Sequence, residues 1–315
     1  TSCRRQHRAR VAARTVRPGA RASVSRVAIA FDNPAAVRAW SDATRSGDRT
    51  IALVPTMGAL HRGHLELIRA ARELADAVVV SIFVNPLQFG ERGDFDHYPR
   101  PLDDDLRACD AEGVDVVFIP TAASMYPDGF ATTVRVSGLT ETMEGAARPG
   151  HFDGVTTVVT KLLTATRPHV ALFGEKDYQQ LAVVRRLAAD LDLGVDIVEH
   201  PTVRESDGLA LSSRNRRLDD AQRNAARCVP EALAAGRVTA MSDRSSVADV
   251  IEAATRTIED EPLADLDYVA VFDAGNLRPI ERFEIDHRRP GRVRIAVAAR
   301  FGDVRLIDNA DLFTH

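Results

Sequence analysis

Residues 51–84 read IALVPTMGALHRGHLELIRAARELADAVVVSIFV, and this stretch decides the fold. Its first five residues form a short apolar run, which is typical of a buried strand. Residues 64–75 predict a helix with Leu65, Ile68 and Leu74 on one face. Residues 77–84 are rich in β-branched side chains, which favour a second strand. A strand, a helix and a strand in this order predict a parallel pair joined by a right-handed crossover.

The same alternation continues to about residue 200. Short apolar runs at 114–120, 169–174 and 195–200 predict further strands, and 154–165 and 177–190 predict helices. We therefore predict an α/β fold built on a Rossmann-like, doubly wound parallel sheet. In such sheets ligands bind beyond the carboxyl ends of the strands, so the loops that follow the strands are the first places to look for a site.

After about residue 203 the pattern changes, and it predicts a smaller C-terminal α+β domain. Two helices are expected there, at 219–235 and 246–259, and three strands follow at 267–272, 291–299 and 303–307. The predicted organisation has three parts. They are an arginine-rich tail at 1–26, a Rossmann-like substrate-binding domain at 27–203 and a C-terminal lid domain at 204–315.

The bulk composition indicates an ordinary globular protein. Of its 315 residues, 45% are hydrophobic and 27% charged, and no apolar run approaches the roughly 18 residues that a membrane helix needs. The three cysteines, Cys3, Cys109 and Cys228, are far apart and form no CxxC pair. This spacing predicts neither a disulfide framework nor a zinc site, and it fits a reducing cytoplasm.

The charge is distributed unevenly along the chain. Residues 1–26 hold eight of the 41 basic residues and no Asp or Glu, so 33 basic residues face 45 acidic ones in the remainder. The tail is expected to be a disordered extension, with an organelle transit peptide and a nucleic-acid arm as alternatives. The acidic body argues against bulk nucleic-acid binding, which depends on neutralising phosphates. A regulatory RNA-binding protein remains the non-enzymatic alternative.

The strongest local signal is PTMGALHRGH at 55–64, between the first strand and its helix. The amide groups and dipole of a helix N-terminus favour an anion. Gly58 and Gly63 allow the backbone to approach a ligand closely. His61 and His64 are three residues apart, where both rings could donate hydrogen bonds to one phosphate. A zinc pair is the alternative, but no third ligand lies nearby in the sequence.

Lysine is almost absent from the chain, which contains only Lys161 and Lys176. Lys176 lies in FGEKDYQQL at 173–181, where a predicted strand ends and a helix begins. Its ammonium group could neutralise phosphate charge there. Asp177 could cap the following helix, and Gln180 would point back toward a pocket. Lys161 is assigned a structural role within a helix.

The string SIFVNPLQFGERGDFDHYPR at 81–100 begins at a strand end. Asn85 and Gln88 supply amides there, which can hold a hydroxyl or carboxylate without adding charge, although Asn85 could equally be a cap. Downstream, Asp104 and Asp105 could contact Mg²⁺ through water, because Mg²⁺ keeps several waters and uses phosphate oxygens. The alternative is an acidic helix N-terminus in solvent.

The segment VRESDGLALSSRN at 203–215 supplies two hydroxyls and a cation, from Ser212, Ser213 and Arg214. A mobile loop with these groups could close over a triphosphate and exclude water. The alternative is a serine-rich linker between domains. Weaker candidates are His151 and Glu144, which are expected to position loops, and Tyr98, which is assigned to the nucleotide site or to the core.

These motifs resemble known proteins. HRGH after a first strand is similar to the adenylyl-transferring superfamily that includes class I aminoacyl-tRNA synthetases and small nucleotidyltransferases. FVNPLQF with YPR, RPGHFDGVTTVVTKLL at 148–163, FGEKDYQQL and LSSRN together resemble the pantothenate synthetase family over roughly residues 27–309. An adenylyltransferase acting on a mononucleotide is the enzymatic alternative.

The resemblance implies a reaction and its participants. Pantoate would attack the α-phosphate of ATP to give pantoyl-adenylate and pyrophosphate, and β-alanine would then displace AMP to give pantothenate. It also implies a Mg²⁺ requirement, a homodimer and a cytoplasmic location, with no nucleic acid or membrane partner.

The resemblance further implies the residues that perform each role. The predicted catalytic residues are His61, His64, Lys176, Ser212, Ser213 and Arg214. The predicted ATP-binding residues are Met57, Gly58, Ala59, Leu60, His61, Arg62, Gly63, His64, Gly174, Glu175, Lys176, Asp177, Val203, Leu211, Ser212, Ser213 and Arg214. The predicted substrate-binding residues are Asn85, Gln88 and Gln180. The predicted metal ligands, Asp104 and Asp105, come from the acidic run itself and not from the resemblance.

Overall fold

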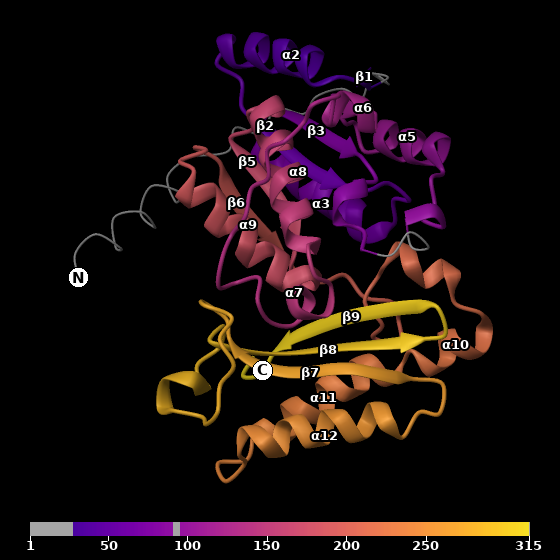
Figure 1. The fold of residues 1–315 in the computed structure, drawn as a ribbon, viewed down its shortest axis with the longest axis vertical. Helices are drawn as coiled ribbons and strands as arrows, with labels where there is room; N and C mark the ends of the chain where they lie inside the picture. Colours follow the sequence, from indigo (N-terminus) through magenta and orange to yellow (C-terminus); the bar gives the residue numbers. More distant parts are fainter. Residues whose placement is uncertain (1–27, 91–94, 315) are drawn as a thin grey trace.

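The computed structural model describes residues 28–90 and 95–314, so the predicted tail at 1–26 lies outside the described residues. Figure 1 shows two stacked parts, an upper α/β part and a lower part built on three strands near the C-terminus. Each part has its own sheet and its own cluster of buried apolar side chains. The predicted fold class is confirmed, whereas the exact domain boundary at 203/204 stays a prediction.

The upper sheet has six strands, and every neighbouring pair is parallel. Their order is β1-β4-β3-β2-β5-β6. The strands are β1 Ile29–Phe31, β2 Ile51–Thr56, β3 Ala77–Ile82, β4 Val116–Phe118, β5 Val170–Gly174 and β6 Asp196–His200. Five of these strands overlap the predicted ones, and β1 was not predicted because three residues carry too little pattern.

Helices cover both faces of this sheet, as a parallel sheet requires. The helices are α2 Pro34–Ser46, α3 Arg62–Leu74, α5 Leu102–Ala111, α8 His151–Thr166 and α9 Tyr178–Asp190. Side chains of α2, α8 and α9 join the core on one face, and those of α3 and α5 join it on the other. This doubly wound arrangement leaves the strand ends free to form a site.

The predicted apolar face of α3 was wrong at one position. Leu67, Ile68 and Ala71 are buried, whereas Leu74 is 51% exposed. Six residues separate Leu74 from Ile68, which at 3.6 residues per turn rotates it to about 240° around the helix, so it points to solvent. The face that packs on the sheet is therefore the one at 67, 68 and 71.

The strand order creates a switch point between β2 and β5. From β2 the chain continues to β3 on one side, and from β5 it continues to β6 on the other side. The connections that leave these two neighbouring strands therefore diverge, which opens a crevice at their carboxyl ends. The histidine motif follows β2, and the lysine loop, residues 175–177, follows β5. The topology thus brings the two predicted motifs to one edge.

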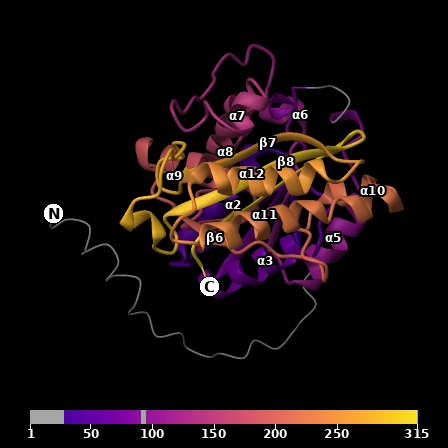
Figure 2. The same ribbon diagram turned by 90° about the horizontal axis from the view of Figure 1, so that it is seen from below.

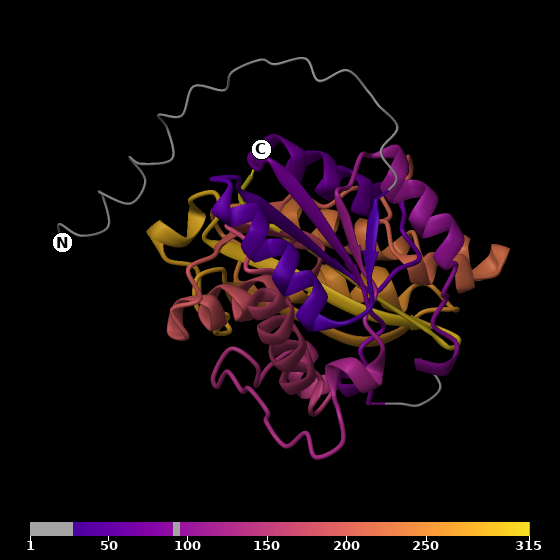
Figure 3. The same ribbon diagram turned by 90° about the horizontal axis from the view of Figure 1, so that it is seen from above.

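The lower part has an antiparallel sheet of order β7-β8-β9 and three helices. The elements are α10 Asp220–Ala225, α11 Cys228–Ala240, α12 Val247–Glu259, β7 Asp265–Asp273, β8 Val293–Phe301 and β9 Val304–Asp311. Helices α11 and α12 cover the outer face of the sheet (Figure 2). Seen from above, the α/β part lies over the opposite face (Figure 3).

Short elements complete the chain and carry several site residues. They are η1 Pro86–Gln88, α6 Ala122–Met125, α7 Glu144–Ala147, η2 Glu175–Asp177, η3 Ser213–Arg217 and η4 Ile285–Arg288. Within the described ranges, no helix is both long and apolar enough to cross a membrane. Cys109 and Cys228 are buried free thiols, and burial raises the pKa of each to about 12.

Candidate functional site

A cavity of about 260 Å³ opens at the carboxyl ends of β2 and β5, and its lining comes from both sheets. The lining includes these predicted residues: Met57, His61, Gly63, His64, Asn85, Gln88, Gly174, Lys176, Asp177, Gln180, Val203, Leu211, Ser212, Ser213 and Arg214. The histidine pair, the lysine loop and the serine-arginine segment therefore share one cavity. The other predicted residues lie outside the lining: Gly58, Ala59 and Leu60 in the loop before α3, Arg62 at the start of α3 and Glu175 at the start of η2.

His61 and His64 cap the N-terminus of α3 reciprocally. His61 is the N-cap, and its Nδ1 accepts a hydrogen bond from the Gly63 amide at 3.2 Å. The Nδ1 of His64 accepts from the His61 amide at 3.3 Å. The two rings stack with centroids 4.0 Å apart. The helix end thus fixes both rings before any ligand arrives.

These hydrogen bonds determine the tautomer of each ring. Because Nδ1 accepts in both, the proton of each neutral imidazole is on Nε2. Desolvation by burial lowers the pKa of His61 to about 4, and the charges of Lys176 and Arg216 contribute to the shift. The pKa of His64 also lies well below its usual value, again mainly through burial. Both rings are therefore neutral at pH 7 and present Nε2–H as a donor.

Gly63 is required by the placement of the His61 ring. A Cβ at this position would lie 3.0 Å from Cε1 and Nδ1 of His61. Any side chain there would push the ring away from the helix end. The spacing H-x-G-H thus reflects the packing of one ring against the backbone, in addition to the approach of a ligand.

The loop between β2 and α3 has left-handed backbone at two consecutive residues, Gly58 (φ 81°) and Ala59 (φ 50°). Asp105 of α5 holds it, because its carboxylate accepts from the Ala59 amide at 2.8 Å and from the Leu60 amide at 2.7 Å. A Cβ at Gly58 would meet that carboxylate at 2.9 Å. Asp105 thus anchors the loop from which His61 and His64 follow.

This geometry favours an anchoring role over the predicted metal role for the two aspartates. Asp105 is 2% exposed and both its oxygens accept backbone amides, whereas the side chain of Asp104 is 70% exposed and pairs with Arg107. Neither lines the cavity. Among residues 28–90 and 95–314, no group of three His, Cys, Asp or Glu side chains could hold a metal ion. The described residues thus offer no cluster of protein ligands for a metal ion, and the assignment of Asp104 and Asp105 to a metal stays a prediction.

Asp105→Asn is expected to lower the free energy of unfolding by about 1–3 kcal/mol. An amide nitrogen cannot accept a hydrogen bond, so one of the two buried backbone N–H groups would lose its acceptor. Urea unfolding without Mg²⁺ measures the loss. Asp104→Asn on the same helix is the control and should stay within about 0.5 kcal/mol of wild type. Unchanged stability in Asp105→Asn, together with a raised Mg²⁺ requirement, would favour the metal role instead.

Lys176 lies in η2, and its side chain is 18% exposed with Nζ 3.7 Å from Asp177 Oδ1. Its charge acts on His61 and His64, whose pKa values it lowers. The predicted helix cap at Asp177 was wrong, because that side chain makes no capping hydrogen bond to α9. Gln180 lines the cavity, whereas the buried Gln179 donates to the carbonyls of Leu139 and Thr142 at 2.9 Å each.

The serine-arginine segment meets the cavity from the other side. Ser212 caps η3 by accepting from the Arg214 amide at 3.2 Å. The Ser213 hydroxyl lies 3.0 Å from the hydroxyl of Tyr98, and the Arg214 guanidinium lies over the Tyr98 ring at 5.9 Å. Tyr98 is buried and lines the cavity. Of the two alternatives that the sequence left open for Tyr98, the core and the site, the structure places its side chain at the candidate site.

Asn85 and Gln88 form a buried polar pair at the end of the cavity nearest α8. Asn85 Nδ2 donates to Gln88 Oε1 at 3.0 Å and to the Gly154 carbonyl at 3.1 Å. Asn85 Oδ1 accepts from the Tyr126 hydroxyl at 2.7 Å and also caps η1. Asn85 therefore holds the side chain of Gln88 in place. It also caps η1, so the capping role that the sequence offered as an alternative is present as well.

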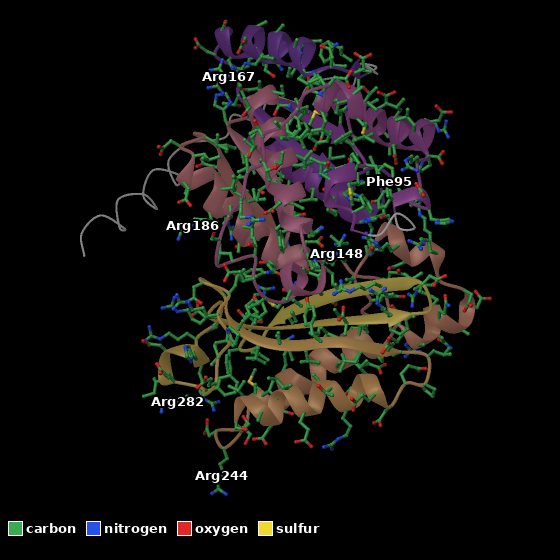
Figure 4. The ribbon with its side chains drawn as sticks, in the orientation of Figure 1. Phe95, Arg148, Arg167, Arg186, Arg244 and Arg282 are labelled. Atoms are coloured by element: carbon green, nitrogen blue, oxygen red, sulfur yellow. The ribbon has the colours of Figure 1, made fainter. Side chains whose placement is uncertain are left out.

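His151, one of the weaker candidates, supports Gln88. The side chains of His151 and Arg148 both contact the backbone carbonyl of Gln88. His151 Nδ1 lies 2.8 Å from the Gln88 carbonyl, and since a carbonyl only accepts, Nδ1 donates. Arg148, which lies between the two stacked parts in Figure 4, donates to the same carbonyl at 3.2 Å. Burial lowers the pKa of His151 to about 4, with the charge of Arg148 adding to the effect.

Stability should fall on acidification between pH 6.5 and about 4. His61 and His151 have folded pKa values of about 4 against 6.5 in the unfolded chain, so the unfolded state binds more protons in this window. Each of the two histidines can lower the free energy of unfolding by up to about 1.4 kcal/mol for each pH unit of acidification in this window. Urea unfolding at pH 7, 6 and 5 measures the slope. His151→Asn should reduce it, and an unchanged slope would contradict the assignment.

Sequence reasoning missed the contribution of the C-terminal sheet. Asn309 of β9 lines the cavity and contacts the lysine loop, and Arg294 of β8 contacts Asn309. Arg216 donates to the Leu60 carbonyl at 3.2 Å. Asn309 and Arg216 lie more than 100 positions from the loops that they contact. Arg216 directly follows the motif at 203–215, whereas Asn309 lies in a stretch without a local motif. The predicted strand ended at residue 307, and only the structure shows that β9 continues through the buried residues Asp308 and Asn309.

Comparisons with known proteins give one consistent result. The family model described as pantoate-beta-alanine ligase matches residues 29–311. A pantothenate synthetase of Heliobacterium modesticaldum is 52% identical over 271 residues, covering 86% of this chain and 94% of its own. One from Mycolicibacterium smegmatis is 51% identical over 280 residues, covering 89% and 86%.

Solved structures agree with these relatives. A pantothenate synthetase from Thermus thermophilus superposes with a TM-score of 0.84 at 45% identity, covering 90% of this chain and 99% of its own. A pantoate-beta-alanine ligase from Francisella tularensis, described as complexed with beta-gamma ATP and beta-alanine, gives a TM-score of 0.73 at 34% identity. That match covers 91% of this chain and 99% of the other.

Proposed function

Because this chain belongs to the pantoate–β-alanine ligase family, we propose that it forms pantothenate by way of a pantoyl-adenylate. The pantoate carboxylate attacks the α-phosphorus of ATP, and the bond to pyrophosphate breaks. The β-alanine amine then attacks the acyl carbon, and AMP leaves with the carboxyl oxygen that it gained. The ammonium protons lost by β-alanine pass to solvent. No covalent bond to the protein is needed.

The cationic and donor end of the cavity suits a triphosphate. The Nε2–H groups of His61 and His64 act with the ammonium of Lys176 as donors that line one cavity. Neutral histidines donate without requiring a protonation step, and charge that builds on the phosphate meets preorganised partners. Ser212, Ser213 and Arg214 add hydroxyls and a second cation from the loop that closes the cavity.

The opposite end of the cavity suits pantoate. Its wall includes Val155, Val158 and Val159 of α8 together with Phe173, and it fits the two methyl groups that pantoate carries on one carbon. Gln88 and Gln180 face the same space and can hold hydroxyl and carboxylate groups. The apolar side chains of this wall also limit the access of water to the mixed anhydride before β-alanine arrives.

The observation that carries this proposal is that donors for phosphate and an apolar, amide-bearing end share one cavity. An assay of AMP tests it. AMP formation should require ATP, pantoate and β-alanine together, and pantoate with ATP alone should give no more than one AMP-equivalent of bound adenylate per active site. Sustained AMP release with another acid would reject it, and so would transfer of the adenylyl group to a mononucleotide, which releases pyrophosphate without AMP.

A Mg²⁺ requirement, a homodimer and a cytoplasmic location belong to the same proposal. The donor set supports Mg²⁺ held through phosphate oxygens and water rather than by a protein cage, because the cavity lining offers few carboxylates. Light scattering in solution measures the oligomeric state, and titration of EDTA against activity measures the metal requirement.

A further inference from the structure

The strand β9 reaches from the C-terminal sheet into the edge of the cavity. Side chains alternate along a strand, so Arg305, Ile307 and Asn309 share one face. That face turns toward the α/β part, because Arg305 contacts Glu144 and both Ile307 and Asn309 line the cavity. Asn309 is 4% exposed, so its polar atoms need partners within the protein.

The side chain of Asn309 is fully engaged on the lysine loop. Its Nδ2 donates one hydrogen to the Glu175 carbonyl at 2.9 Å and the other to the Lys176 carbonyl at 2.8 Å. Its Oδ1 accepts from Arg294 Nε at 2.8 Å. Because arginine only donates, this contact fixes which end of the amide faces the loop.

Arg294 is itself held rigidly. It is buried, its guanidinium lies 4.1 Å from the centroid of the Tyr178 ring, and its Nη2 is 3.8 Å from the Glu175 carboxylate. The C-terminal sheet therefore contacts the lysine loop at three points. Asn309 binds the carbonyls of Glu175 and Lys176, and Arg294 lies near the Glu175 carboxylate.

We propose that Asn309 is a positioning residue for the reaction, which sets the place of Lys176 through the backbone of its loop. The inference rests on the proposed phosphate role of Lys176. A shift of about 1 Å in a catalytic group can cost about 100-fold in rate. The C-terminal sheet thereby contributes to catalysis through a residue that need not touch the phosphates.

A double-mutant cycle tests this, with kcat for AMP formation at saturating substrates as the readout. Asn309→Ala should lower kcat by about 10- to 100-fold. Asn309→Asp should lower it at least as much, because a carboxylate has no hydrogens for the two carbonyls. In a Lys176→Ala background, Asn309→Ala should change kcat by less than about twofold, since the group it positions is already gone.

Val304→Ala, a core truncation on the same strand, is the matched control: it should lower Tm and leave kcat within about twofold. If Asn309→Ala does not fold, Asn309→Ser, which keeps one hydroxyl donor, replaces it in the cycle. Equal losses from Asn309→Ala in both backgrounds would overturn the positioning role. A normal kcat for Lys176→Ala alone would instead overturn the proposed phosphate site, so the two failures are distinct.

Discussion

Replacing His64 with alanine is expected to lower kcat about 100-fold. His64 is buried and neutral, and its Nδ1 is occupied by the His61 amide, which leaves Nε2–H as the group that can reach phosphate. Loss of one preorganised donor to developing charge typically costs about 10²- to 10³-fold in kcat. The steady-state rate of AMP formation measures it, with circular dichroism to verify that the variant remains folded although the capping contact of His64 is lost.

Two near-isosteric variants separate the roles of the two ring nitrogens. The amide nitrogen of His64→Gln can occupy the place of Nε2 and donate, whereas the amide oxygen of His64→Asn can occupy the place of Nδ1 and accept from the His61 amide. If donation from Nε2 supplies the rate, the glutamine variant should be at least about fivefold faster than the asparagine variant, a difference of about 1 kcal/mol. The reverse order would show that the capping contact matters more than the donor.

The sequence predicted the sheet well where apolar runs are continuous. The strands β2, β3 and β5 are buried along almost their whole length, and such runs are visible without any structure. By contrast, β1 has three residues and α2 contains Trp40 and Val37 in a mostly polar segment, so neither was predicted. The hydrophobic pattern of a sequence therefore predicts a strand or helix when most of its side chains are buried and when it is longer than a few residues.

The candidate site was predicted as far as local motifs extend. The loops after β2 and β5 carry their own signals in His61, His64 and Lys176, and strand order then brings them together. Asp105 illustrates the limit: its acidic neighbours suggested a metal or a helix end, and only the fold shows its two amide partners. The contacts of Asn309 depend on how two sheets stack, which no local pattern encodes.

Glu144 at the junction of the two parts should have the largest effect on stability. Its carboxylate accepts from Arg305 Nη1 at 2.7 Å and Nη2 at 2.8 Å, and from the Tyr268 hydroxyl at 2.9 Å. Burial alone would raise its pKa, but the hydrogen bonds and charge of Arg305 outweigh burial and the net shift is downward. The pair joins α7 to β9 and therefore links the α/β part to the C-terminal sheet.

Glu144→Gln is expected to lower the free energy of unfolding by about 3 kcal/mol at pH 7. Removing one partner of a buried pair typically costs about 3–5 kcal/mol, and the lower end applies because Arg305 keeps its bond to Asp267 at 2.7 Å. Because the folded pKa is lowered, the carboxylate stabilises the fold above the unfolded pKa of 4.5. The difference between wild type and variant should therefore shrink as the pH falls below 4.5.

Urea unfolding at pH 7 and at pH 4 measures both parts of this expectation. Glu252→Gln is the matched control, because Glu252 pairs with Arg256 on the exposed face of α12 and such surface pairs contribute about 0–1 kcal/mol. A loss in Glu144→Gln no larger than in this control would mean that solvent reaches the junction. The two parts would then be held together by their other contacts, such as those of Tyr178 with Phe272, whose ring centroids are 6.2 Å apart, and those of Asn309 with the lysine loop.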